Sequence, residues 1–142
     1  MAVIRYGAWG DVLQSASILP GLKRQGYHVI FFCTPRGIEA IRNDTNIDEF
    51  VIQNEDMVPN HLLTEYFDYL KGKYTKVINL CETVEGIVLP TSHRANFHWS
   101  KEARHFVCNR NYIELQHLVA GVPFSKPEMK FYSTKAEDEW AR

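Results

Sequence analysis

The chain has 142 residues, the length of one domain, and its composition of 45% hydrophobic and 23% charged residues excludes a disordered chain or a disulfide-dense miniprotein. Sixteen Lys and Arg stand against 17 Asp and Glu, and a net charge of −1 argues against a general attraction to nucleic acid. No apolar run approaches the ~20 residues of a membrane span, and the first residues lack the order of a signal peptide. Three widely spaced cysteines predict reduced thiols and a cytoplasmic protein: Cys33, Cys81 and Cys108.

The first 26 residues predict a strand, a turn and a helical segment. Residues 2–6 form a short apolar run, and two glycines follow it in the turn of residues 7–11. From Asp11 onward, apolar residues recur every three or four positions, which predicts a helix that ends at Gln25-Gly26. Pro20 lies inside this pattern, so it either kinks the helix or begins a second one.

The rest of the chain continues the alternation of strands and helices. Strands are predicted at 27–33, 50–52, 77–80 and 129–132, and helices at 35–42, 61–70, 112–120 and from 136 onward. Residues 81–109 show no regular pattern, and we expect an irregular excursion there. Because the strands are apolar on both faces, the fold class is α/β, with an open, mostly parallel sheet flanked by helices.

The turn after the first strand carries the sharpest functional signal. Gly7 and Gly10 allow the backbone to turn tightly and to approach a ligand closely. Ligands of open parallel sheets bind at this edge, beyond the carboxyl ends of the strands. The spacing is Gly-x-x-Gly, which matches neither a dinucleotide fingerprint nor a P-loop. Two interpretations of Asp11 stay open: a helix N-cap, or a general base at the mouth of a cleft.

Several runs resemble one enzyme family. The stretch VIRYGAWGDV at 3–12, followed by ILPGLK at 18–23, is similar to the opening of the ADP-heptose:lipopolysaccharide heptosyltransferase family. The later runs NIDEFV at 46–51 and KVINL at 76–80 resemble stretches that come before the third strand and at the fourth strand of that family. The likeness covers most of residues 2–125, and its first motif is the most specific.

The resemblance implies one half of a GT-B glycosyltransferase. Residues 1–142 would be a single Rossmann-like acceptor-binding domain, with a linker from about 126 toward a C-terminal donor-binding domain. The family's reaction inverts the anomeric carbon without a metal or cofactor, and its donor is a nucleotide-sugar such as ADP-heptose. The family's catalytic base matches Asp11. The chain is therefore expected to be an N-terminal domain of a longer enzyme or a natural half-protein, and inactive alone.

The resemblance also implies an anionic sugar or lipid-linked saccharide as the acceptor, and peripheral membrane association is compatible with it. Gly7, Trp9 and Gly10 are candidate acceptor-binding residues, although Trp9 can equally cover the edge of the sheet. Residues 91–110 are rich in Lys, Arg and His, and form either a solvated surface or a loop that grips an anion. The arginine candidates for that contact are Arg36, Arg94 and Arg104.

Other functions are weaker alternatives. The chain could be a stand-alone module that binds a sugar, a nucleotide or a partner without turnover. A Rossmann oxidoreductase is disfavoured because Thr34-Pro35-Arg36 stands where that fold needs an acid after the second strand. Glu82 and Glu85 follow the fourth strand and could bind hydroxyls, but helix caps explain them more simply. The spacing of His93, His98, His105 and Cys108 fits no standard zinc site, so we expect no metal.

Overall fold

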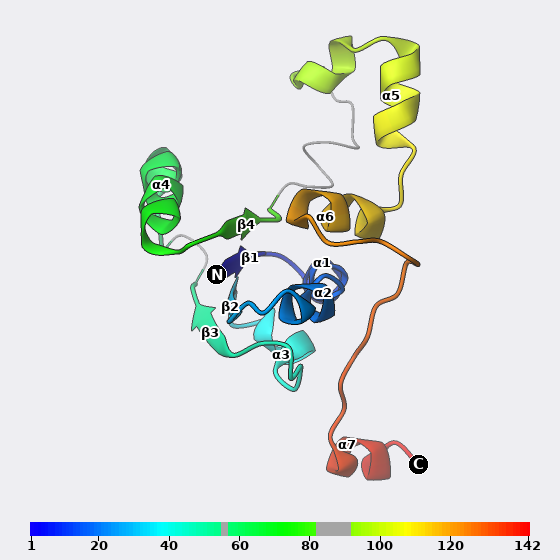
Figure 1. Ribbon diagram of the computed structural model, residues 1–142. Coiled ribbons are helices and arrows are strands. Elements are labelled where there is room, and N and C mark those ends of the chain that lie inside the picture. The colour runs from blue at the N-terminus through cyan, green and yellow to red at the C-terminus, as the bar shows by residue number, and fades with distance from the viewer. Residues whose placement is uncertain (55–56, 82–91) are drawn as a thin grey trace.

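The computed structural model describes residues 1–54, 57–81 and 92–142, and its centre is a sheet of four parallel strands (Figure 1). The strands are β1 (Ala2–Ile4), β2 (Ile30–Cys33), β3 (Glu49–Ile52) and β4 (Val77–Asn79), in the spatial order β3-β2-β1-β4. Val3 of β1 pairs with Phe31 on one side and Ile78 on the other. The prediction of a parallel α/β sheet is confirmed.

Helices cover both faces of the sheet (Figure 1). On one face lie α1 (Trp9–Ala16), α2 (Leu19–Arg24), α3 (Ile38–Ile41) and α6 (Tyr112–Ala120). On the other face lies α4 (Leu63–Lys73), which a 3-10 turn at Asn60–Leu62 precedes. The chain thus moves outward from β1 to β3 over one face and returns to β4 over the other, which is consistent with a Rossmann-like fold.

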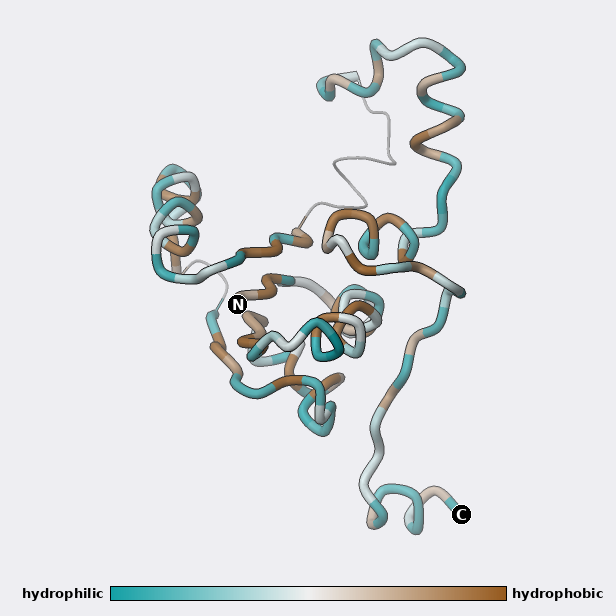
Figure 2. The backbone as a smooth tube through the Cα atoms, viewed as in Figure 1, coloured by the Kyte–Doolittle hydropathy of each residue, from teal (hydrophilic) through white to brown (hydrophobic). Residues whose placement is uncertain are grey.

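Alternate residues of the strands build the two halves of the core. Val3 and Phe31 point toward α1, α2 and α6, where Val12, Leu19 and Leu22 are fully buried. The intervening residues of the same strands face α4; among them, Ile4 and Phe32 pack with Leu70, and Tyr74 meets the ring of Phe32 edge-on. Both faces are apolar, as in other parallel sheets, and Figure 2 shows the hydrophobic stretches gathered at the strands. Because both faces must be covered, the sheet's free edges and strand ends are the places left for a ligand.

Several helices and strands begin or end at other residues than the sequence predicts. The first strand ends at Ile4, so Tyr6 lies in the following loop, and the second strand begins at Ile30 rather than Tyr27. Pro35 lies in a turn, and α3 begins only at Ile38. Of the two roles considered for Pro20, the second is confirmed, because the proline lies in the first turn of a separate helix, α2.

Two expectations outside the sheet are wrong. Residues 101–108, expected to be irregular, form the helix α5 (Lys101–Cys108), which Ser100 caps by accepting a hydrogen bond from the amide of Ala103. The expected strand at 129–132 does not form, because this stretch lies away from the sheet. Side chains hold it instead: Asn43 donates to the carbonyl of Tyr132.

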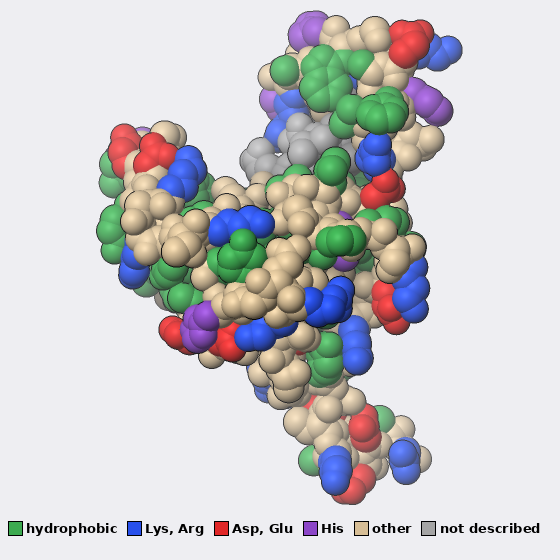
Figure 3. Space-filling view, viewed as in Figure 1, with side chains coloured by type: hydrophobic (Ala, Val, Ile, Leu, Met, Phe, Trp, Pro, Cys, Tyr) green, Lys and Arg blue, Asp and Glu red, His purple; other side chains and the backbone are tan. Residues whose placement is uncertain are grey.

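Two parts of the chain extend from the body of the molecule in opposite directions (Figure 1). One contains a 3-10 turn at Ala95–His98 (η3) and α5, and Figure 3 shows hydrophobic, basic and histidine side chains on its surface. The other is the segment after Gly121, which ends in α7 (Lys135–Trp140); Thr134 caps this helix, and an ion pair of 2.7 Å joins Arg42 to Glu137. Within the described residues, no helix has the length and apolarity needed to cross a membrane.

Candidate functional site

The strand order reverses between β1 and β4, and a hollow of about 660 Å³ opens at that point. In open parallel sheets, this reversal leaves a crevice at the carboxyl ends of the strands, since the following connections diverge to opposite faces. The residues that line the hollow come from the ends of both strands and from the helices on either side: Arg5, Tyr6, Gly7, Asp11, Leu63, Phe67, Asn79 and Cys81. Two of the sequence-predicted site residues, Gly7 and Asp11, are among them.

Asp11 is held at the mouth of this hollow by two contacts. One carboxylate oxygen accepts a hydrogen bond of 2.8 Å from Arg5, and the other accepts one of 3.1 Å from the amide of Ala8. The helix begins at Trp9 with Ala8 as its N-cap, so Asp11 is the third helical residue and not the cap. Of the two interpretations of Asp11, the N-cap is therefore wrong in position. The Asp11 carboxylate still accepts a hydrogen bond from a backbone amide at the start of the helix. Its side chain is 34% exposed, so a ligand can reach it.

Arg5 connects the end of β1 to both sides of the hollow. Its side chain is only 3% exposed, and its two terminal nitrogens donate to the carbonyl of Leu80 and to Asp11, each at 2.8 Å. A buried guanidinium needs such partners, because transferring a charge from water is costly unless it is paired and hydrogen-bonded. Since Arg5 is fixed between two elements, it sets the direction in which the carboxylate of Asp11 points.

The two glycines of the turn differ in what they do. Gly7 has φ +153°, and a Cβ atom at this position would lie 2.8 Å from an oxygen of Asp11. Gly10 lies inside α1, and a Cβ atom there would meet nothing within 4 Å. Of the two glycines, Gly7 therefore has the backbone conformation that favours glycine, whereas Gly10 is an ordinary helical residue. Only Gly7 is needed for the close approach of the loop to Asp11.

The remaining sequence-predicted residues lie outside the hollow. Trp9 is half exposed in the first turn of α1, and Arg36 is exposed in the turn after β2, at the same edge of the sheet. Arg94 and Arg104 belong to the projecting η3–α5 part, and neither lines the hollow that contains Asp11. The structure therefore does not bring these arginines together with Asp11.

A second, smaller hollow of about 210 Å³ adjoins the first along the same edge of the sheet. Tyr6 and Leu63 line both hollows, so the two form neighbouring parts of one groove. The hydroxyl of Tyr6 donates to the side-chain oxygen of Gln53, whose amide nitrogen donates to the hydroxyl of Tyr66 at 2.6 Å. Burial, and then the neighbouring Tyr66, raise the pKa of Tyr6 above its usual value, which keeps this phenol protonated and donating.

Sequence reasoning missed most of this groove. Gln53 and Tyr66 are 47 and 60 positions from Tyr6, and no local pattern relates residues that meet only through the tertiary fold. Arg5 did carry a signal, because a charged residue at the end of a buried apolar run must find a partner. The position of Asn79 at the end of the fourth strand carried another, since polar residues there face the ligand-binding edge.

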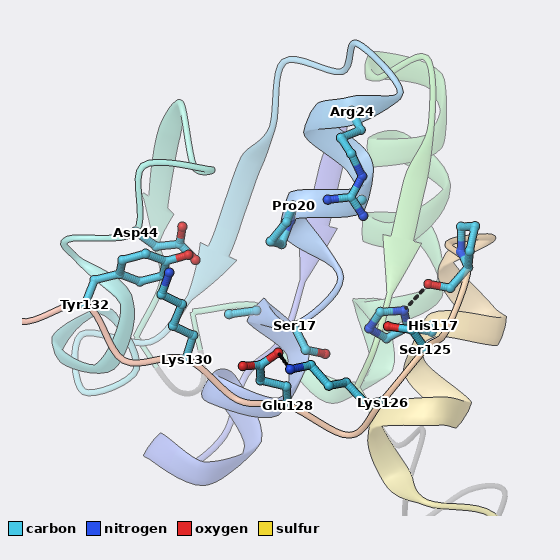
Figure 4. Close-up of a pocket in the computed structure, with 13 residues that line it drawn as sticks. Ser17, Pro20, Arg24, Asp44, His117, Ser125, Lys126, Glu128, Lys130 and Tyr132 are labelled. Carbon is cyan, nitrogen blue, oxygen red and sulfur yellow. Dashed lines mark hydrogen bonds and ion pairs between the residues drawn. The ribbon is translucent and has the colours of Figure 1, made fainter.

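A third hollow of about 310 Å³ lies under the segment that follows α6 (Figure 4). Figure 4 shows this segment crossing the junction of α1 and α2. At the α6 side of the hollow, the ring of His117 bonds to the carbonyl of Pro123 at 3.0 Å. Charges of both signs line it, and Lys126 is paired with Glu128 at 2.9 Å. Ala16 and Ser17 at the end of α1 line this hollow, whereas the start of α1 lies at the Asp11 hollow, so the two are separate sites.

Among residues 1–54, 57–81 and 92–142, no three His, Cys, Asp or Glu side chains come together as metal ligands. His93, His98, His105 and Cys108 all belong to the projecting part. Glu82 and Glu85 lie outside the described residues. No disulfide joins the three cysteines, and burial raises the pKa of the Cys33 thiol to about 11.

Comparison of the chain with protein-family models, with curated proteins and with solved structures finds no significant match. The chemistry of the groove is therefore the basis for the functional argument.

Proposed function

We propose that this chain is the acceptor-binding domain of an inverting, metal-independent glycosyltransferase, in which Asp11 is the general base. The observation that supports the proposal is the position of Asp11, which lines the hollow at the strand reversal with its carboxylate oriented by Arg5. In an inverting transfer, the base takes the proton of the acceptor hydroxyl as that oxygen forms a bond to the anomeric carbon of the donor. The bond from that carbon to the nucleotide phosphate breaks, and the nucleotide leaves as an anion.

The similarity of the first 23 residues to the heptosyltransferase family supports the same assignment, because the family's base matches Asp11. On this proposal, the donor is a nucleotide-sugar such as ADP-heptose, and a second, GT-B-type domain binds it. The present chain supplies the acceptor site and the base. Its partners are thus a saccharide acceptor, which can be lipid-linked at a membrane surface, and a donor-binding domain. A cytoplasmic location, where nucleotide-sugars are made, fits this role.

The test is the variant Asp11→Asn, assayed for sugar transfer in the protein that contains this chain together with the donor-binding domain. Asn keeps an oxygen that can accept from Arg5 but cannot take a proton. We expect the transfer rate to fall about 10²- to 10⁴-fold with the fold retained. Asp68→Asn is the matched control, because Asp68 is exposed on α4, pairs with Lys71 and does not line the hollow that contains Asp11. A transfer rate that Asp11→Asn leaves unchanged contradicts the assignment of the base.

One observation favours a second candidate, a binding module without turnover. Both oxygens of Asp11 already accept hydrogen bonds from the protein, which is what a purely structural carboxylate would do. On that alternative, ligands bind in the groove, no nucleotide-sugar supports transfer, and Asp11→Asn lowers the stability of the chain rather than a reaction rate.

A further inference from the structure

We infer that the smaller hollow, lined by Tyr6, Gln53 and Tyr66, binds an uncharged sugar ring. The inference rests on the proposed function, since it names the class of acceptor group that would lie next to Asp11. It differs from an anionic acceptor recognised by arginines. From here on, this hollow is called the tyrosine cleft, and its described lining residues are Tyr6, Thr34, Gln53, Asn54, Met57, Val58, Asn60, Leu63 and Tyr66.

The first argument is charge. None of the described residues that line the tyrosine cleft carries a charge at neutral pH. Among the described residues that line the adjoining hollow, the charged ones are Arg5 and Asp11, which form an ion pair with each other. The two stretches outside the described residues, 55–56 and 82–91, contain no Lys or Arg in their sequence. A phosphate or carboxylate is normally bound by Arg forks, Lys or several backbone amides. An anionic ring would find no cation to pair with in this cleft.

The second argument is the hydrogen-bonding pattern. The hydroxyl of Tyr6 donates to Gln53, and Gln53 donates to the hydroxyl of Tyr66, so three neutral side chains form one connected network of donors and acceptors. Asn54 and Asn60 line the same cleft, and the side-chain amide of neither one is hydrogen-bonded to a described residue. An amide offers both donors and an acceptor, which matches sugar hydroxyls, since each of these both donates and accepts. A phosphate can only accept and would leave the amide oxygens without a partner.

The third argument is shape and apolar surface. A hollow of about 210 Å³ is smaller than the ~300–1,000 Å³ of sites for drug-sized ligands, and suits a single ring. The rings of Tyr6 and Tyr66, with Met57 and Leu63, present apolar surface beside the amides. A sugar ring has a C–H face and a rim of hydroxyls, and needs this combination of aromatic surface and neutral polar groups.

The position of the cleft agrees with the reaction. Tyr6 and Leu63 line both the cleft and the hollow that contains Asp11, so a ring in the cleft lies beside the base. A hydroxyl on the side of the ring that faces the neighbouring hollow is then the one presented to Asp11. Any charged groups of a larger acceptor would extend out of the groove toward solvent.

The experiment is a titration of the 142-residue chain, followed by the shifts of its backbone amide signals in NMR spectra. The probes are the uncharged methyl glycosides of a hexose and a heptose, and the corresponding sugar phosphates. We expect the glycosides to shift the signals of the described lining residues 53, 54, 57, 58, 60 and 66 in a saturable manner at millimolar concentration. Raising the salt concentration from 50 to 500 mM should change the Kd less than about twofold, since no ion pair is involved.

Two variants and a matched control sharpen the test. Tyr66→Phe removes one hydroxyl and should weaken glycoside binding about fivefold, the equivalent of one hydrogen bond. Tyr69→Phe is the control, because Tyr69 lies on the same helix, is exposed and does not line the cleft. Asn60→Lys places a cation at the rim. This variant should also weaken glycoside binding about fivefold. An unchanged glycoside Kd contradicts a contact between the ring and Asn60.

The outcomes separate this inference from the proposed function. The absence of saturable shifts at residues 53, 54, 57, 58, 60 and 66, or tenfold tighter binding of sugar phosphates than of glycosides, overturns the inference of an uncharged ring. Equal effects of Tyr66→Phe and Tyr69→Phe also overturn it. Asp68→Asn should leave glycoside binding unchanged, because Asp68 is exposed on α4 and does not line the cleft. If glycosides bind but the Asp11→Asn protein transfers sugar normally, only the assignment of Asp11 as the base is contradicted. If Asp11→Asn abolishes transfer but glycosides do not bind, only the inference of an uncharged ring is contradicted.

Discussion

Replacing the two glycines of the first turn with alanine, one at a time, should have opposite effects on stability. At Gly7 the backbone adopts φ +153°, a conformation that residues with a Cβ atom avoid at a cost of ~1–3 kcal/mol. The new methyl group would also lie 2.8 Å from an oxygen of Asp11. Displacing that oxygen removes its bond to the amide of Ala8, which adds about 1 kcal/mol. The free energy of unfolding should therefore fall by about 2–4 kcal/mol for Gly7→Ala.

Gly10 gives the matched control within the same motif. It lies in α1 with open space around it, so Gly10→Ala introduces no clash and reduces the freedom of the unfolded chain. We expect a gain of ~0.5–1 kcal/mol, the usual difference between glycine and alanine in a helix. Urea unfolding followed by far-ultraviolet circular dichroism measures both variants. Equal changes for the two variants, or a Gly7→Ala protein as stable as the parent, would refute the assignment of strain to Gly7.

Three further predictions concern other parts of the fold. Hydrogen bonds from Lys23, above all, lower the pKa of Asp48, so its contribution to stability is present above the ordinary carboxyl pKa and is lost as the pH falls. Urea titrations should accordingly find Asp48→Asn less stable than the parent at pH 7 and nearly equal to it at about pH 2. Burial raises the pKa of Cys33 to about 11, so mass spectrometry should find this thiol unmodified by iodoacetamide at pH 8 in the native state and modified in urea. A Cβ atom at Gly21 would lie 2.2 Å from the side chain of Val122; Gly21→Ala should lower the unfolding free energy by ~1–3 kcal/mol, and Val122→Ala in the same chain should restore part of that loss in thermal melts.

The architecture could be predicted from the sequence because local patterns determine it. Apolar runs such as Ile30–Cys33 must be buried on both faces, and the helical spacing between them requires crossovers and therefore parallel strands. The helix α5 was missed because polar and apolar side chains share its eight residues equally, and the signal for its start was the single serine at position 100. The strand expected at 129–132 does not form: Met129 and Phe131 are exposed, and a short pattern along the chain does not specify a neighbouring strand to pair with.

The candidate site could be predicted only in part. Asp11 and Gly7 were found because they are neighbours in one turn, and spacing along the chain reports on such contacts. The bond network of Tyr6, Gln53 and Tyr66 depends on how α4 lies across the sheet, and no local pattern contains that information. The hypothesis that Arg94 contacts an acceptor rested on charge alone. Charge along the sequence does not specify where a loop lies in space.

The bond from Arg5 to the carbonyl of Leu80 has a consequence for the order in which the protein assembles. These residues are 75 positions apart, and the contact can form only after β4 has docked beside β1. Strands β1, β2 and β3 lie within the first 52 residues and can pair earlier, since closing shorter loops loses less entropy. The carboxylate of Asp11 is oriented by Arg5, so it reaches its final position late in folding. Hydrogen exchange at the amide of Leu80, which bonds to the carbonyl of Ile4, would therefore report how often the site opens while the other three strands stay paired.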